Sequence, residues 1–406
     1  MSEMTATRTG RATLLVAGPL WLLAAWLLWR TQVPGSLELP PLRSRDVFAE
    51  AELREATAYA RVPRVLWLLW TVVSLALLGL LAWRGPRLAA RLPGRPLVRG
   101  VVLLLLVLAA LWLVRLPVGL AGQWWRRRHG VSRQPYLEYV LSPWLELLAT
   151  AGLACVALVL GMLMARRLGP GWWLAGGLAL AVLGSGALLL QPLVLAPRLE
   201  PLRDRTLAGQ IEALARKQGI GAIDVEVRRA SDRTRRANAE VAGLGPTRRV
   251  ILWDTLLDGR FARGEVLVIA AHELAHVSRR HLLRGLGWFA LAAVPGVFVL
   301  AAVTGRQGGL AEPGAVPLAV LTVVLLLLVT APLTNVISRR YEAEADWVAL
   351  ETTRDPGSAR ALLRRLSRTG LVDPDPPAWS YALLSTHPSL LERVAMAEAW
   401  RLGLER

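Results

Sequence analysis

The sequence predicts a mainly α-helical, polytopic membrane protein with about seven transmembrane helices and a small α+β domain. Of its 406 residues, 54% are hydrophobic and only 19% are charged, and the mean hydropathy is +0.41. Soluble domains average about 45–50% apolar and about 25% charged residues, so a purely soluble chain is excluded. The same apolar fraction excludes disorder over most of the chain. The single cysteine, Cys155, excludes a disulfide scaffold.

Long apolar runs give the number of predicted spans. A helix needs about 20 apolar residues to cross the hydrocarbon core of a bilayer. Six charge-free runs meet this length: Ala12–Trp29, Val65–Trp83, Leu147–Ala165, Leu168–Pro197, Gly285–Gly305 and Pro313–Ser338. A seventh, Gly100–Val114, is short and continues beyond Arg115 to Trp125. Tryptophans at several run ends are typical of interfacial belts. The first run is longer than a signal-peptide core of about 7–15 residues, so we expect it to be retained.

The runs divide the chain into four parts. Residues 1–197 form an N-terminal membrane region with five spans, and 198–284 form a water-facing α+β part. Residues 285–338 form a two-span hairpin, and 339–406 form a C-terminal helical part. Within the water-facing part, periodicity predicts a helix over Leu207–Gln218, a strand over Ile223–Arg228, a strand over Arg249–Leu257 that enters a helix, and a helix over Gly264–Arg280.

The net charge of +18 does not indicate a nucleic-acid partner. All but one of the 48 basic residues are arginine, which points to a composition bias, and they are not interleaved with stacking aromatics.

Most arginines near membrane ends lie on the side of both water-facing parts, which predicts that this side is cytoplasmic. The arginine-rich loop expected at Arg84–Arg99 disagrees with this orientation. The composition looks bacterial, so we expect a bacterial cell membrane.

A motif with metal-ligand spacing lies in the helix predicted over Gly264–Arg280. His272 and His276 are four residues apart, so a helix places both imidazoles on one face. Two such imidazoles can bind one zinc ion, and Glu273 lies beside them to act on a water molecule. A surface helix with two solvated histidines is the alternative. It is weakened because the chain has only five histidines and two have this spacing.

A catalytic zinc site needs a third protein ligand and an open position for water. Three acidic residues after the last span are candidates: Glu342, Glu344 and Asp346. Glu342 and Asp346 share a helix face because they are four residues apart, whereas Glu344 points elsewhere. Two predicted spans separate His276 from Glu342, so the chain returns to the same membrane side. A solvated helix start is the alternative for this acidic cluster.

Several motifs of this chain form a recognisable set. The main ones are His272-Glu273-x-x-His276 and S-R-x-x-E-x-x-A-D at Ser338–Asp346. Three further segments belong to the set: Asn238-Ala239 with Arg249–Leu257, Ser385-Thr386-His387-Pro388-Ser389 with Arg393, and Arg128-x-Gly130-x-Ser132-x-Gln134. Together they resemble the membrane-embedded zinc metallopeptidases of the CAAX prenyl protease type I family. Seven spans also agree with this family, so the resemblance covers nearly the whole chain from about Arg61.

The resemblance implies roles that spacing alone leaves open. It implies that Glu342 is the third zinc ligand and that Asp346 supports a zinc-binding histidine. It also implies that His387 and Arg393 face the reacting carbonyl, and that Asn238 and Ala239 lie at an edge strand that holds substrate. The family usually has an aromatic residue after the Asn-Ala pair, whereas Glu240-Val241 follows here. This departure puts the substrate preference in doubt, but not the zinc chemistry.

Each of these residues also has a structural interpretation. His387 could lie in a helix start with Thr386 as its cap, Arg393 could be a surface arginine, and Asn238 could be a turn residue. His281 lies five residues after His276, off the ligand face, and is not expected to bind metal.

The predicted function is that of an integral membrane zinc metalloendopeptidase. It binds one Zn²⁺ per chain and uses Glu273 as general base. Its predicted partners are a peptide or membrane-protein substrate and the lipid bilayer, with no nucleic acid. A bacterial origin makes prenylated substrates unexpected, and general membrane-protein turnover is the broader prediction. A seven-span transporter or a non-catalytic scaffold with a structural metal are the alternatives; the sequence predicts no oligomeric state.

Overall fold

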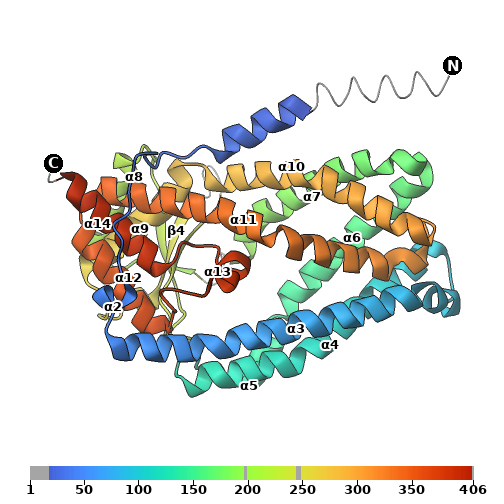
Figure 1. The fold of residues 1–406 in the computed structure, drawn as a ribbon, viewed down its shortest axis with the longest axis horizontal. Coiled ribbons are helices and arrows are strands. Elements are labelled where there is room, and N and C mark those ends of the chain that lie inside the picture. Colours follow the sequence, from blue (N-terminus) through green and yellow to red (C-terminus); the bar gives the residue numbers. More distant parts are fainter. Residues whose placement is uncertain (1–17, 196–198, 244–247, 405–406) are drawn as a thin grey trace.

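In the computed structural model, long helices extend from a compact end that carries a small sheet and several shorter helices (Figure 1). The structure describes residues 18–195, 199–243 and 248–404. Residues 12–17 of the first predicted span and 196–197 of the fifth lie outside this part. The described remainder of every predicted span is helical.

The long apolar helices account for all the predicted runs. They are α3 (Glu50–Arg91), α4 (Pro96–Arg128), α6 (Trp144–Leu168), α7 (Trp172–Leu195), α10 (His281–Thr304) and α11 (Val316–Thr353), besides a shorter helix over Gly18–Trp29. Five helical stretches are long and apolar enough to cross a membrane. One of them, Tyr136–Ala187, includes both α6 and most of α7, which are separated by a 3-10 turn at Gly169–Gly171. The predicted number of seven spans therefore stays a prediction.

Several helices extend far beyond their apolar runs. Helix α3 has 42 residues, whereas about 20 suffice to cross a bilayer. The loop expected at Arg84–Arg99 is wrong for most of its length, because α3 continues to Arg91 and α4 begins at Pro96. The first charged residue therefore marks the end of the apolar run, but the helix itself continues beyond it. In this region α3 approaches another backbone closely: a side chain at Gly85 would collide with the carbonyl oxygen of Gly314.

A four-stranded sheet forms the centre of the compact end. Its strands are β1 (Leu199–Pro201), β2 (Asp224–Arg228), β3 (Ala239–Ala242) and β4 (Arg249–Trp253), in the order β1-β2-β4-β3. Strands β2 and β4 pair in parallel, and the other two pairs are antiparallel. The apolar centre of β4 is fully buried, which explains its run of branched side chains. The strands predicted at β2 and β4 are confirmed, and β4 enters a 3-10 helix at Asp254–Leu256.

Short helices complete the core around this sheet. They are α8 (Arg205–Lys217), α9 (Arg263–Ser278), α12 (Pro356–Gly370) and α14 (Leu390–Leu404). Three other short helices are not part of this core: α13 (Ala378–Leu384), which packs against α11, α2 (Ser44–Val47) and α5 (Tyr136–Leu141). The predicted helices at α8 and α9 are confirmed. Asp204 caps the start of α8, because its carboxylate accepts a hydrogen bond from the Leu207 amide. Helix α11 crosses the predicted boundary between residues 338 and 339 without a break.

Helix α9 is held at its start by a charged pair. The Glu265 side chain is only 2% exposed, and both of its oxygens accept hydrogen bonds from Arg365 of α12, at 3.0–3.3 Å. One oxygen also accepts from the Ala262 amide, which would otherwise be an unpaired donor at the helix start. This pair therefore fixes the start of α9 against α12.

We expect the Arg365→Ala variant to unfold more easily than the wild type. Removal of the guanidinium leaves a buried carboxylate without its main partner, which costs about 2–3 kcal/mol for a partly exposed pair. The free energy of unfolding, measured by denaturant titration of the detergent-solubilised protein, checks this. The neighbouring Arg364 is exposed, so Arg364→Ala is the matched control. Equal losses in the two variants would contradict the role of the pair.

Candidate metal centre

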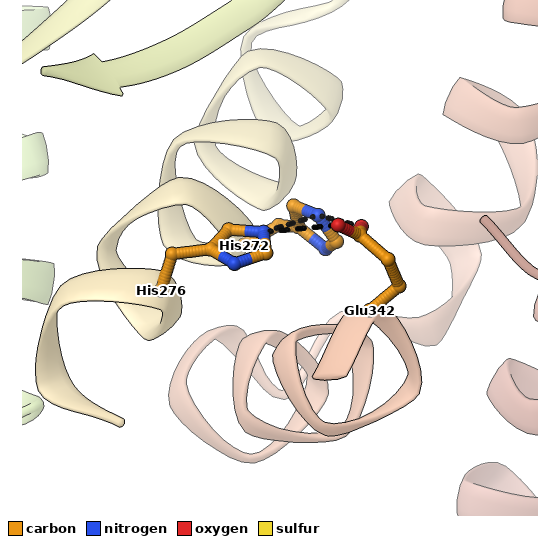
Figure 2. Close-up of side chains that lie close together, drawn as sticks. All are labelled: His272, His276 and Glu342. Carbon is orange, nitrogen blue, oxygen red and sulfur yellow. Dashed lines mark hydrogen bonds and ion pairs between the residues drawn. The ribbon is translucent and has the colours of Figure 1, made fainter. Parts of the chain in front are cut away.

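Helix α9 presents two histidines from a buried position. The helix packs against α11, α12, α8, β3 and β4. Its residues Ala270, Ala271, Leu274 and Ala275 are fully buried and contribute only apolar atoms. Since His272 and His276 are one turn apart, their rings project from the same side of α9 (Figure 2).

The third group of the cluster comes from α11. Helices α10 and α11 form a hairpin that returns the chain to α9 (Figure 1), and α11 directs Glu342 toward both imidazoles (Figure 2). His272 Nε2 lies 3.2 Å from Glu342 Oε2, and His276 Nε2 lies 3.7 Å from Glu342 Oε1. One ligand atom from each of the three residues lies within 4.8 Å of the others.

This donor set fits a zinc ion. The two Nε2 atoms face each other at 3.3 Å, an arrangement of two lone pairs that needs a cation or a proton between them. Burial alone would lower the pKa of His272, but the carboxylates of Asp346 and Glu342 raise it. Burial and the charge of His272 lower the pKa of His276. Two imidazoles and one carboxylate, with one position left for water, are the ligands of catalytic zinc sites.

Asp346 supports His272 on the side away from the cluster. Its Oδ1 lies 2.9 Å from His272 Nδ1. The guanidinium of Arg393, from α14, donates two hydrogen bonds to the same carboxylate, at 2.7 and 2.8 Å. Such a carboxylate keeps the proton on Nδ1 and leaves the Nε2 lone pair free for a metal. The structure thus directs Arg393 to Asp346, so that these two residues lie in line behind His272.

Glu273 lies beside the ligands and has a free carboxylate. Among the described residues, none donates a hydrogen bond to it. Burial raises the pKa of the Glu273 carboxyl to about 7, where a group can both accept and release a proton near neutral pH. It is therefore available to a water molecule at this site.

His387 reaches the cluster from the loop between α13 and α14. Its Nε2 lies 3.2 Å from Glu342 Oε2, and its side chain is 54% exposed. Arg339 of α11 holds this loop in place, since it donates hydrogen bonds to the carbonyls of Tyr381 and Ser385. The structure therefore brings His387 to the open side of the three ligands.

Ala239 begins the edge strand β3, which packs against α9, and Asn238 directly precedes it. Ala239 is buried, whereas Asn238 is exposed and its carbonyl accepts a hydrogen bond from the Trp253 amide. No described strand pairs with the outer edge of β3. A cavity of about 600 Å³ lies nearby, and Arg236, Ala237, His387 and Arg393 are among its lining residues. This volume is typical of sites for small ligands or peptide side chains.

One group of residues near the site was not predicted from the sequence. His281 contacts His276 directly, with 2.9 Å between their Nδ1 atoms, although helical spacing placed it off the ligand face. The reason is a break between α9 and α10: Arg280 adopts a left-handed conformation (φ 55°). Glu344, one of the three candidates for third ligand, lies 3.1 Å from His281 Nε2 and is absent from the cluster of ligand atoms.

Similar proteins support the interpretation of this cluster as the metal site of a peptidase. Residues 201–401 match the profile of peptidase family M48. The chain carries an M48 peptidase domain. The family predicted from the motifs is confirmed, because similar proteins are named as metalloproteases and as CAAX prenyl protease 1 homologues.

The M48 domain has relatives in distant organisms. The Uncharacterized metalloprotease YhfN of Bacillus subtilis is 30% identical over 240 residues, and a CAAX prenyl protease 1 homolog of Oryza sativa is 26% identical over 223 residues. These matches cover 56% and 52% of both chains, so the chain spans about half the length of the curated relatives it matches. The crystal structure of S. mikatae Ste24p has the same fold, with a TM-score of 0.72, 18% identity, and coverage of 93% of this chain and 96% of that one.

We expect Asp346→Ala to weaken zinc binding about 10- to 100-fold, because His272 loses the carboxylate that fixes its tautomer. Competition with a chromophoric chelator measures the dissociation constant on the purified protein. Glu351, an exposed acid on the same helix, provides the control variant Glu351→Ala. An Asp346→Ala protein that is folded and binds zinc as the wild type does would contradict this support.

Proposed function

We propose that this M48 protein is an integral membrane zinc endopeptidase that hydrolyses peptide bonds of membrane-associated proteins or peptides. The observation that carries the proposal is the convergence of His272, His276 and Glu342 beside the free carboxylate of Glu273. A transporter or a scaffold with a structural metal needs no unpartnered base next to its ligands.

The three ligands and Glu273 have different roles in the proposed hydrolysis. His272, His276 and Glu342 would hold a zinc ion, which would supply a Lewis acid able to polarise a carbonyl and make a water molecule more acidic. Glu273 accepts a proton from the attacking water and delivers it to the leaving amine. Because Glu273 is partly buried and has no competing hydrogen bond, its basicity is available for this transfer.

His387 and Arg393 take different parts in this proposal. His387 lies on the open side of the ligands, where its Nε2 can donate a hydrogen bond to the carbonyl oxygen as negative charge develops on it. Arg393 acts through Asp346, because both of its hydrogen bonds go to that carboxylate. It therefore positions His272, the ligand that Asp346 supports.

The substrate pairs with the outer edge of β3. Asn238 and Ala239 lie where this edge meets α9, and the nearby cavity reaches His387. Main-chain hydrogen bonds to an edge strand hold an extended peptide without strict sequence demands. This mode suits the turnover of varied membrane proteins, and it needs no lipidated residue. The arginine distribution supports a site on the cytoplasmic side, and the composition supports a bacterial membrane.

We expect Glu273→Gln to lose peptidase activity by about 10²- to 10⁴-fold while it keeps its zinc, because only the proton acceptor is removed. Chelator should abolish wild-type cleavage, and added zinc should restore it. Cleavage of a labelled membrane-protein substrate and the zinc content are measured on the same preparations. Chelator-resistant cleavage, or an unimpaired variant, would overturn the zinc-peptidase function and favour a structural metal.

We expect Val241→Pro to reduce kcat/KM several-fold. Val241 lies opposite Val250 in the pairing of β3 with β4. Three residues earlier, the Asn238 carbonyl accepts a hydrogen bond from the Trp253 amide, so Asn238 and Trp253 form a hydrogen-bonded pair. Because hydrogen bonding alternates along an antiparallel ladder, the Val241 amide faces the free edge. Proline removes this donor and leaves the ladder to β4 intact, at a cost of about 1 kcal/mol in substrate binding. Val241→Ala keeps the amide and is the control; equal activity of both variants would exclude pairing at this position.

A further inference from the structure

His276 has a buried support that differs from that of His272. Its Nδ1 lies 2.9 Å from Nδ1 of His281, a side chain that is 5% exposed. On its other side, His281 Nε2 lies 3.1 Å from Oε2 of Glu344, which is 2% exposed. A line of three groups therefore runs from the carboxylate of Glu344 through one imidazole to the next.

The chemistry of imidazole fixes every proton along this line. A carboxylate only accepts, so His281 donates from Nε2 and its neutral ring keeps a lone pair on Nδ1. That lone pair accepts a hydrogen bond from Nδ1–H of His276. His276 is then left with its lone pair on Nε2, the atom that faces His272 and Glu342. The only tautomer that satisfies all three groups is the one that can bind a metal.

The surroundings hold His281 in this orientation. Its ring stacks on Tyr341, with centroids 4.9 Å apart and planes at 6°. The phenol of Tyr341 donates to the Leu28 carbonyl and accepts from the indole of Trp288. The Tyr341 ring is held by these two hydrogen bonds of its hydroxyl group. The imidazole that stacks on it therefore has little freedom to rotate.

Glu344 is fixed by groups from two distant segments. Its Oε1 accepts a hydrogen bond from the Gln32 amide at 2.8 Å, and its Oε2 accepts one from Arg284 at 2.8 Å. The same guanidinium donates to the carbonyls of Leu28 and Arg30. The segment after the first apolar helix thereby reaches the carboxylate at the end of the line.

We propose that His281 is a positioning residue, which holds His276 in its metal-binding tautomer and is itself held by Glu344. The inference rests on the zinc site proposed above. The two histidine ligands then have unequal supports: Asp346 contacts His272 directly, whereas Glu344 acts on His276 through a second imidazole.

Two amide substitutions at position 281 separate this role from simple packing. The amide of asparagine reaches about where imidazole Nδ1 lies, so His281→Asn keeps an acceptor for His276. The amide of glutamine reaches about where Nε2 lies, so His281→Gln keeps a donor for Glu344 and loses the contact to His276. His281→Leu removes both contacts.

We expect zinc affinity to fall about 10- to 100-fold in His281→Leu and His281→Gln, and to be largely retained in His281→Asn. The full-length purified protein is titrated with zinc against a chelator, and the ligand-field absorption of the cobalt-loaded protein is recorded. The cobalt bands should shift in the leucine and glutamine variants and stay near those of the wild type in the asparagine variant. His129→Leu is the matched control, because His129 packs between Tyr59 and Trp125 outside this group.

Each outcome decides one of the two proposals. Unchanged affinity in His281→Leu, or retention by glutamine and loss in asparagine, would overturn the positioning role. If the leucine variant does not fold, the comparison of asparagine with glutamine decides alone, since both residues are polar. A wild-type protein that binds no zinc would instead overturn the proposed metal site.

Discussion

The contact between α9 and α11 is the constraint on which the site depends. Three polar contacts join a histidine of α9 to an acid of α11: His272 to Glu342 and Asp346, and His276 to Glu342. Buried imidazoles and carboxylates are costly unless each finds a partner. The two helices therefore cannot slide past each other without leaving charged groups unpaired, and the register that satisfies them is the one that assembles a metal site.

Supports outside the cluster extend this constraint to the rest of the chain. Arg393 of α14 holds Asp346, and Arg339 holds the loop that carries His387. On the opposite side, the segment at Leu28–Gln32 reaches Glu344 and Arg284. Elements from both ends of the sequence thus meet around α9 and α11, which explains why the M48 domain alone, residues 201–401, does not contain every residue that fixes the ligands.

Local geometry decided what the sequence could predict. The shared face of His272 and His276 follows from helical spacing alone, so the ligand pair was predictable. The choice among Glu342, Glu344 and Asp346 depends on how α11 is rotated against α9, a tertiary quantity that spacing leaves open. His281 was missed because helical spacing from His276 put it off the ligand face, whereas α9 ends at Ser278 and the turn at Arg280 folds the next imidazole back. No residue pattern at Arg280 signals a left-handed conformation, since glycine usually occupies such positions.

The continuity of α11 has a mechanical consequence for the site. One unbroken helix runs from Val316 through an apolar segment to Glu342, Asp346 and Thr353. Pro332 removes one main-chain hydrogen bond inside this helix, but the helix continues through it, so a tilt of its apolar segment moves the acids against the histidines of α9. The bonds from α13 and α14 to α11 oppose such a tilt at its polar end. The position of the third ligand is therefore set jointly by packing within the membrane hairpin and by the buried ion pairs of the compact domain, and neither part alone determines it.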